Sequence, residues 1–243
     1  MRNCLIELVS QTASFRDPEF QNFHKALPLP TPTNVIGLVG AALGLPPMDA
    51  QTFFEANELR IGISGNYRAK SKDLWKYCKE VKELWKYHPN MGTGSSIVLR
   101  EFLFNYRLKI VFQSHSDNAI EKIMQGFDNP FFFLTFGNSD SLAHVVRIQS
   151  DMEATSDEVV KDCMLEGDLM MQIKDRIQDA FDFSLSAAPA VYHLPTAFSY
   201  ESAYGKREIS RAKTFSLITG TAKLNYKVEG VNCNGLFIPL ITF

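Results

Sequence analysis

The sequence has no apolar run that is long enough to cross a membrane as a helix. A membrane-spanning helix needs about 20 consecutive apolar residues, and the longest apolar stretches, 34–45 and 130–136, are shorter and contain small or polar residues. The first residues do not resemble a secretory leader, because Glu7 stands where an apolar segment would run. We therefore expect no membrane partner.

Cysteine and the common catalytic motifs are also scarce. The four cysteines (Cys4, Cys78, Cys163 and Cys233) are scattered, with no Cys-x-x-Cys pair and no histidine at ligand spacing. This excludes a typical zinc site or disulfide framework and indicates a reducing, cytoplasmic location, with no metal or cofactor. The glycine-rich segment 92–96 lacks the Lys-Ser/Thr ending of a phosphate-binding loop, and no Gly-x-Ser-x-Gly motif is present.

Net charge is small, at −2, but the charges are segregated along the chain. Residues 1–150 carry 16 Lys+Arg and 14 Asp+Glu, residues 151–182 carry 3 and 10, and residues 183–243 carry 6 and 3. Segregated charge creates fields and docking surfaces, so a nucleic-acid partner is compatible with most of the chain. The acidic segment 151–182 should face solvent or a basic partner protein, because phosphate would be repelled.

Hydrophobic residues make up 45% of the chain and include 19 phenylalanines, which indicates a β-rich core. Thr33 is a candidate N-cap for an apolar helix that Gly44 can end. In chain order, the patterns predict a strand over 2–9, a buried helix over 34–44, strands over 58–66 and 97–112, a helix over 117–126, and extended segments over 130–136 and 143–149. This order predicts an α+β fold with a ferredoxin-like β-α-β-β-α-β unit, the plan of RNA-recognition modules.

The insert between the second and third predicted strands, about 67–96, is basic and aromatic. From Tyr67 to His88 it has seven basic and three acidic residues, and it contains both tryptophans. Such a composition is typical of surfaces that bind single-stranded nucleic acid. Leu74, Cys78, Val81 and Trp85 fall at helical spacing, which predicts a helix. The alternative is an ordinary solvated helix whose tryptophans pack on its apolar face.

Residues 151–243 differ from residues 1–150 in composition and sequence pattern. An acidic, partly helical stretch is expected up to about residue 183, followed by short strands. The clearest strand signals lie over 213–219 and 235–243. We expect a smaller, β-rich C-terminal region.

Four segments together resemble a known family. Residues 12–16 (Thr-Ala-Ser-Phe-Arg) and 27–44, followed by 100–103 and 134–139, are similar in order and spacing to family five of the CRISPR-associated RAMP proteins. That family supplies the subunit that holds the crRNA 5′ handle in type I effector (Cascade) complexes. The resemblance implies a ferredoxin-like palm over 1–150, a thumb at the insert, and a β-rich C-terminal part over 151–243.

The resemblance also implies partners. The subunit would cap one end of a filament of Cascade backbone subunits, contact the large subunit that reads the PAM, and support binding of target DNA in antiviral defence. Sequence specificity for DNA would reside in the guide.

Candidate RNA contacts follow from residue chemistry and from the resemblance. Aromatic rings can stack bases and cations can bind phosphates, and a helix N-terminus at Thr33 offers backbone N–H groups to a phosphate. The alternative for the loop before that helix is that Phe15 is a core residue and Arg16 pairs with Asp17 or Glu19. The predicted RNA-binding residues are Phe15, Arg16, His24, Lys25, Thr33, Asn34, Tyr67, Arg68, Lys70 and Arg100.

An enzymatic function is the main alternative. One branch of the family cleaves precursor crRNA without metal, which requires a general base, a general acid and a cation. His24 and Lys25, with a nearby tyrosine, are candidates for those roles. The segments above are closer to the non-cleaving branches, so we predict no catalytic residues and no enzyme activity. A stand-alone RNA-recognition-like binder unrelated to CRISPR is the second alternative.

Overall fold

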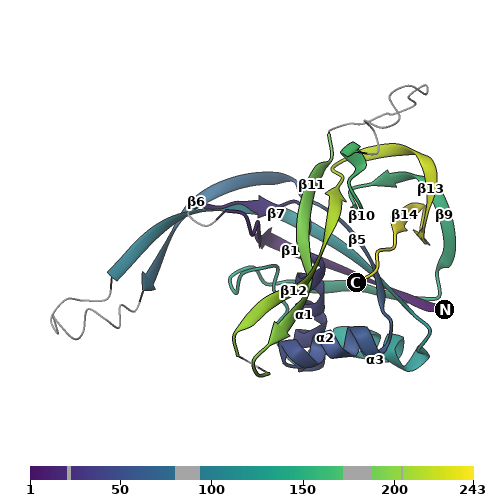
Figure 1. The fold of residues 1–243 in the computed structure, drawn as a ribbon, viewed down its shortest axis with the longest axis horizontal. Coiled ribbons are helices and arrows are strands. Elements are labelled where there is room, and N and C mark those ends of the chain that lie inside the picture. Colours follow the sequence, from purple (N-terminus) through teal and green to yellow (C-terminus); the bar gives the residue numbers. More distant parts are fainter. Residues whose placement is uncertain (21–22, 80–93, 172–187, 204) are drawn as a thin grey trace.

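The computed structural model describes residues 1–20, 23–79, 94–171, 188–203 and 205–243. It has a body of several sheets and three helices, from which a two-stranded arm projects (Figure 1). The fold is therefore α+β, with strands in the majority, and no helix in the described residues is long and apolar enough to span a membrane. The helices are α1 (Pro32–Leu43), α2 (Pro47–Ala56) and α3 (Asp117–Asp128).

The strands are spread over the whole chain. In the first part they are β1 (Arg2–Ala13), β2 (Phe15–Arg16), β3 (Phe23–His24), β4 (Ala26–Leu27), β5 (Arg60–Asn66), β6 (Ala69–Lys79), β7 (Gly94–Ser114) and β8 (His144–Ser150). In the second part they are β9 (Glu153–Lys161), β10 (Met164–Glu166), β11 (Ala190–Tyr200), β12 (Arg207–Leu217), β13 (Thr221–Cys233) and β14 (Leu236–Pro239).

The main sheet has the order β8-β1-β7-β5, and each of these neighbouring pairs is antiparallel. Successive side chains on a strand point to opposite faces, so each strand contributes alternate residues to each face. One set faces α1 and α3 and forms the largest apolar cluster of the structure. From β1 and β7 that cluster takes Cys4, Ile6, Leu8, Leu108, Ile110 and Phe112.

The boundaries of α1 show what its sequence encodes. The N-cap is Thr31, so the prediction of Thr33 was wrong. The Thr31 hydroxyl accepts a hydrogen bond from the Asn34 N–H at 3.2 Å. In return, the Asn34 side chain accepts one from the Thr31 N–H at 3.1 Å. Pro32 then occupies the first helical position, where its missing N–H costs nothing. Gly44 ends the helix with φ 71°, as predicted.

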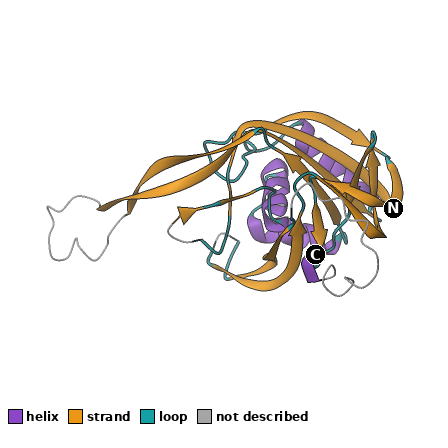
Figure 2. Cartoon of the chain, turned by 90° about the horizontal axis from the view of Figure 1, so that it is seen from above, coloured by secondary structure: helices purple, strands orange, loops and turns teal. Residues whose placement is uncertain are grey.

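Strand β7 is long because it pairs with β5 along one part of its length and with β6 along another. Residues 107–113 pair with β5, whereas residues 94–104 pair with β6. Asn105, between the two sets, has φ 50°, a left-handed conformation that asparagine tolerates better than most residues. The strand predicted over 97–112 is thus confirmed, and β6 with the first half of β7 forms the arm (Figures 1 and 2).

The helix predicted in the insert was wrong over residues 69–79, which form β6. Every residue of β6 has a partner on β7, and this pairing overrides the weak helical spacing. Lys70 and Lys72 alternate with Ser71 and Asp73, but Leu74 interrupts this pattern, so the sequence shows no clear period of two. Val81 and Trp85, which contributed to the helical pattern, lie outside the described residues.

The C-terminal strands cover part of the second face of the main sheet. Leu5 and Val111, which point away from the helices, form a core cluster with Met152, Val231 and Ile238. The sheet β14-β13-β9 is therefore packed over one end of that face. The other end of the face is not covered by this cluster.

Other expectations for the second half and the loops need correction. The acidic segment, expected to be partly helical, is extended over β9 and β10 and helical at residues 169–171, and its remainder from residue 172 onward lies outside the described residues. Residues 130–136 form no strand, only an isolated bridge from Thr135 to Leu142. The strands predicted near 143–149, 213–219 and 235–243 correspond to β8, β12 and β14, and α2, β11 and β13 were not predicted.

Candidate nucleic-acid interface

A groove lies on the open end of the main sheet's second face. Its volume is about 1010 Å³, and it is lined by β1, the end of β5, the middle of β7 and the loop that leads to β8. A smaller hollow of about 270 Å³ shares Asn66 and Arg107 with it and reaches Lys109 and Lys161. We call both together the sheet groove. The polar residues that line its larger part include Tyr67, Arg68, Asn105, Arg107, Asp140 and His144.

Cations and carboxylates both line the sheet groove: Lys109 and Lys161 stand in its smaller part with Glu7, the direct cross-strand partner of Lys109, and Asp162. Arg68, Arg107 and Lys109 form no ion pair within the part of the chain that the structure describes. The carboxylate of Asp140 is already held by Arg100 at 2.8 Å, which reduces its repulsion of an anion. Unpaired guanidinium and ammonium groups beside an extended strand are suited to the phosphates of a nucleic acid.

The structure brings two of the predicted contacts, Tyr67 and Arg68, into this groove, where the arm leaves the body. Sequence reasoning missed Arg107, Lys109 and His144. The signal for the first two was present in 105–110 (Asn-Tyr-Arg-Leu-Lys-Ile), where polar and apolar residues alternate. Such alternation indicates a strand with one buried face and one polar face.

A second aromatic and cationic group lies at the base of the arm. His24 of β3 pairs with Arg100 of β7, and its ring centroid lies 5.8 Å from that of Trp75. The Arg100 guanidinium lies 5.5 Å from the Trp75 ring centroid. Burial, together with the charges of Arg16 and Arg100, lowers the pKa of His24 below its usual value. This shift favours the neutral form of the His24 imidazole, and the Trp75 ring, which both side chains contact, is 39% exposed.

Arg100 itself is engaged by the protein, so it does not fit the predicted role of a free phosphate contact. Its guanidinium donates two hydrogen bonds to Asp73, at 3.2 and 2.9 Å, and one to Asp140 at 2.8 Å. These carboxylates, Asp73 first, raise its pKa in spite of burial. Arg100 thus joins both strands of the arm to the loop before β8.

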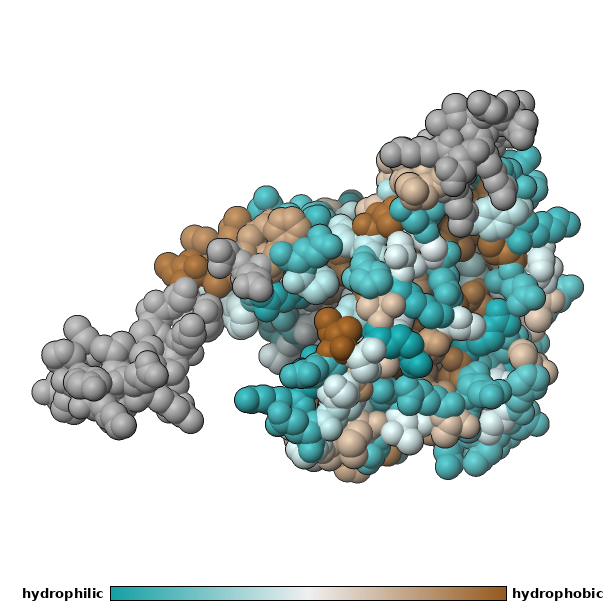
Figure 3. Space-filling view, viewed as in Figure 1, coloured by the Kyte–Doolittle hydropathy of each residue, from teal (hydrophilic) through white to brown (hydrophobic). Residues whose placement is uncertain are grey.

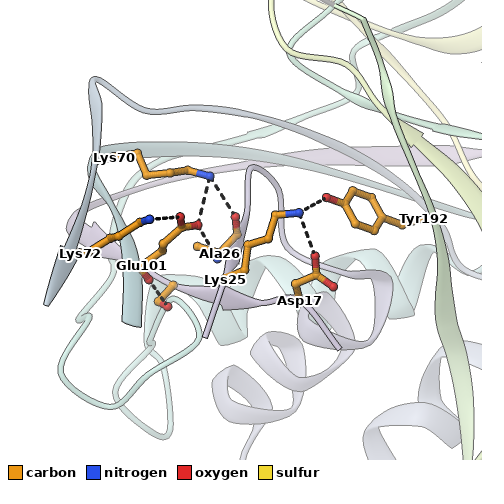
Figure 4. Close-up of polar contacts among 8 residues, drawn as sticks. Asp17, Lys25, Ala26, Lys70, Lys72, Glu101 and Tyr192 are labelled. Atoms are coloured by element: carbon orange, nitrogen blue, oxygen red, sulfur yellow. Dashed lines mark hydrogen bonds and ion pairs between the residues drawn. The ribbon is translucent and has the colours of Figure 1, made fainter. Parts of the chain in front are cut away.

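The neighbouring residue, Glu101, anchors the arm on its other face (Figure 4). Its carboxylate accepts the Ala26 N–H at 3.2 Å and lies 3.5 Å from Lys70 and 3.8 Å from Lys72. Lys70 also donates to the Ala26 carbonyl at 3.3 Å. Lys70, predicted as an RNA contact, is therefore partly committed to this anchor.

Lys25 belongs to a separate set of contacts (Figure 4). Its ammonium lies 3.2 Å from the Tyr192 hydroxyl and 3.5 Å from the buried carboxylate of Asp17. Burial alone would lower the pKa of Lys25, but Tyr192 and Asp17 outweigh it and raise the pKa. Lys25 therefore stays a cation, and its contacts are not shared with His24, which faces Trp75.

Three further predicted contacts have local roles. Phe15 is only 2% exposed and packs edge-on against Tyr106 at 5.2 Å, so the alternative of a core residue is correct and base stacking is excluded in this conformation. The Asn34 N–H is bonded to Thr31, and Thr33 contacts the Thr31 hydroxyl at 3.1 Å, so this helix start is already capped. Exposed Arg16 donates to the Phe20 carbonyl at 3.4 Å, while Asp17 pairs with Lys25.

The arm exposes apolar side chains as well as charge. Leu74 and Leu99 are direct cross-strand partners, and Ile97 lies beside them opposite Lys76. All three aliphatic side chains are exposed. Figure 3 shows apolar residues gathered where the arm leaves the body, whereas most of the body in this view is hydrophilic.

We expect Arg100→Ala to destabilise the fold, because it leaves two carboxylates facing each other without their shared cation. The Arg100 side chain is 10% exposed, but Asp73 and Asp140 are 41% and 56% exposed, so solvent will screen part of the effect. The free energy of unfolding should fall by about 1–3 kcal/mol, which lowers Tm by roughly 2–10 °C in a chain of this size.

Thermal unfolding followed by circular dichroism would measure this change. Arg2→Ala is the matched control, because Arg2 also bridges two carboxylates, Glu121 and Asp151, but at the exposed edge of the body. It should change Tm much less. Equal shifts in the two variants would contradict the anchoring role of Arg100.

A family model matches most of the chain. Residues 4–209 match the family described as CRISPR-associated protein (Cas_Cas5). A CRISPR protein from Archaeoglobus fulgidus shares the fold with a TM-score of 0.51 at 12% identity, over 100% of both chains. A chain of a CRISPR RNA-guided surveillance complex has a TM-score of 0.51 at 12% identity, over 90% of this chain and 91% of that one. No curated protein matches the sequence significantly.

Proposed function

Because the chain belongs to the CRISPR-associated protein (Cas_Cas5) family, we propose that it is a crRNA-binding subunit of a type I CRISPR effector complex. The observation that carries the proposal is the sheet groove: Arg68 and Arg107 line its larger part with Tyr67, Lys109 lines its smaller part, and none of the three cations has an ion pair among the described residues. Its ligand is the 5′ handle of the crRNA. The protein acts in the cytoplasm, in antiviral defence.

The architecture supports this role. We interpret the β8-β1-β7-β5 sheet with α1 and α3 as a ferredoxin-like palm, because the order of strands and helices along the chain is the one that this fold requires. The arm is the thumb of that palm. Its β7 residues, 94–104, run directly into Asn105–Arg107, which line the sheet groove, so one RNA strand can contact both.

The sheet groove and the base of the arm make different contacts with the RNA. In the sheet groove, the two arginines and Lys109 bind phosphates, and Tyr67 and His144 contact bases or sugars. At the arm base, the exposed ring of Trp75 stacks a base where handle meets spacer. The arm and the outer surface of the body then contact a backbone subunit and the large PAM-reading subunit. Target DNA reaches this protein only through the guide and those partners.

We further propose that the chain does not cleave RNA. A 2′-hydroxyl attack needs a base and an acid that reach the same phosphodiester. Lys25 is held as a cation by Asp17 and Tyr192, whereas His24 contacts Trp75 in a different set. This arrangement favours a binding role for both residues.

Incubation with labelled repeat RNA in EDTA tests the function and the absence of cleavage together. We expect a retarded complex on a native gel and intact RNA on a denaturing gel. A discrete product that His24→Ala abolishes and that the exposed control His193→Ala retains would identify an endoribonuclease instead. Failure to retain repeat RNA would contradict handle binding.

A further inference from the structure

Three consecutive phenylalanines are exposed in the loop after α3. Phe131, Phe132 and Phe133 are 71%, 55% and 89% exposed. We call them the phenylalanine loop. Exposed apolar patches of a few hundred Å² are costly in water, and on soluble proteins they mark interaction sites. Nothing in the RNA-binding role described above uses these rings.

The phenylalanine loop is held in a defined conformation. Its backbone N–H groups cap the last turn of α1: Phe131 donates to the Ala42 carbonyl at 3.0 Å, and Phe132 donates to the Ala41 carbonyl at 3.1 Å. Gly44 makes room for the first ring, since a Cβ at this position would lie 2.7 Å from Phe131. The rings of Phe131 and Phe132 pack edge-on with centroids 4.7 Å apart. These contacts hold the first two rings in place and reduce the ordering cost of binding.

The position of the loop separates it from the sheet groove. It is bonded to α1, and α1 packs on the face of the main sheet that carries Ile6 and Leu8. The sheet groove contains Val9 and Arg107, which belong to the opposite face. An RNA strand in the groove therefore leaves the three rings uncovered.

The surrounding charge indicates what kind of partner covers them. Exposed Asp128 ends α3 just before the loop, and exposed Asp49 lies in the first turn of α2, which follows Gly44. Carboxylates repel phosphate, so a nucleic acid is disfavoured here. A protein surface with an apolar pocket and a basic rim complements both the rings and the carboxylates.

We propose that the phenylalanine loop is the docking point for a neighbouring protein subunit of the effector complex, which takes the rings into an apolar pocket. This inference rests on the proposed function. Each buried aromatic ring supplies roughly 150–250 Å², against roughly 800 Å² per partner in a typical specific interface. The loop is thus the apolar centre of a larger contact, where the strongest contributions to affinity concentrate.

The test is assembly of the complex from the chain, its crRNA and the proteins encoded with it, measured by native mass spectrometry. The double variant Phe132→Ser/Phe133→Ser leaves Phe131 against Gly44 and should reduce the assembled fraction at least tenfold. Its affinity for crRNA as an isolated chain should stay within about twofold of the wild type. Ile209→Ser, which removes an equally exposed apolar residue from β12, is the control and should assemble normally.

A photoreactive phenylalanine analogue at position 133 keeps the rest of the chain intact and identifies the occupant. We expect crosslinks to a protein subunit. Crosslinks to crRNA, crosslinks to a second copy of this chain, or normal assembly of the double variant would each overturn the proposal while the proposed function stands. A wild-type chain that does not enter the complex would overturn both.

Discussion

Replacing both Arg68 and Arg107 with alanine should weaken binding of the crRNA 5′ handle by about 100-fold or more. Each guanidinium that contacts a phosphate contributes roughly 1.5–3 kcal/mol through charge-assisted hydrogen bonds, and about 1.4 kcal/mol corresponds to tenfold in Kd. Both residues are exposed and unpaired among the described residues, so the fold should be unaffected. Fluorescence anisotropy with a labelled handle RNA would measure the loss.

The salt dependence of binding makes the same test more specific. Each lost phosphate contact on a single strand lowers the slope of log K against log salt concentration by about 0.7, so the double variant should lose roughly 1.4. Lys122→Ala removes an exposed cation from α3, on the helical side of the body, and should change neither affinity nor slope. Equal effects of this control and the double variant would show that binding depends only on overall charge.

Shortening the arm should abolish assembly of the crRNA complex while the body still folds. Asp73 and Arg100 are direct cross-strand partners, so replacing residues 74–99 with an Asn-Gly turn closes a short hairpin at that pair. The Arg100 and Glu101 anchors remain in place. The deletion removes Trp75, the exposed aliphatic residues of the arm, Val98, which is 8% exposed, and the pairing of Leu99 with Phe23 of β3.

Two measurements separate the outcomes of this deletion. Calorimetry should show a cooperative transition with Tm lowered only modestly, because the cation–π contact of Trp75 contributes roughly 0.5–2 kcal/mol. Native mass spectrometry should show loss of the assembled complex. An insoluble chain would mean that the arm completes the core, and a shortened chain that assembles normally would refute the thumb assignment.

The elements around the core were readable from the sequence because their patterns are local. The short, mostly apolar segment of β1 and the apolar run of α1 before Gly44 each stand out in a short window of sequence. The arm was misread because the pairing of β6 with β7 decides its conformation, and four residues at helical spacing do not reveal such a partner. Helix α2 was not predicted because Pro46 and Pro47 directly follow the end of α1, where proline is common after a helix as well as at the start of the next one.

The site residues were predicted less completely than the core elements, because the pairing of charged side chains depends on the folded structure. Composition shows that a segment is basic, but not which cations are already paired. The partners of Arg100 and Lys70 include Asp140 and Glu101, which lie 40 and 31 residues away along the chain. Arg107 and Lys109 were overlooked because they stand inside a strand that otherwise supplies the core. Tyr67 and Arg68 were found because they follow directly after a strand, at the start of a basic segment.

The central claim is that the 5′ handle lies in the sheet groove, and crosslinking of the native ribonucleoprotein tests it most directly. A crRNA with 4-thiouridine at single handle positions would be assembled with the full-length chain, irradiated, digested and sequenced by mass spectrometry. We predict that handle nucleotides crosslink to peptides that contain residues 66–68 and 105–109. Crosslinks confined to α1, α2 and α3, or found only with spacer nucleotides, would contradict the account.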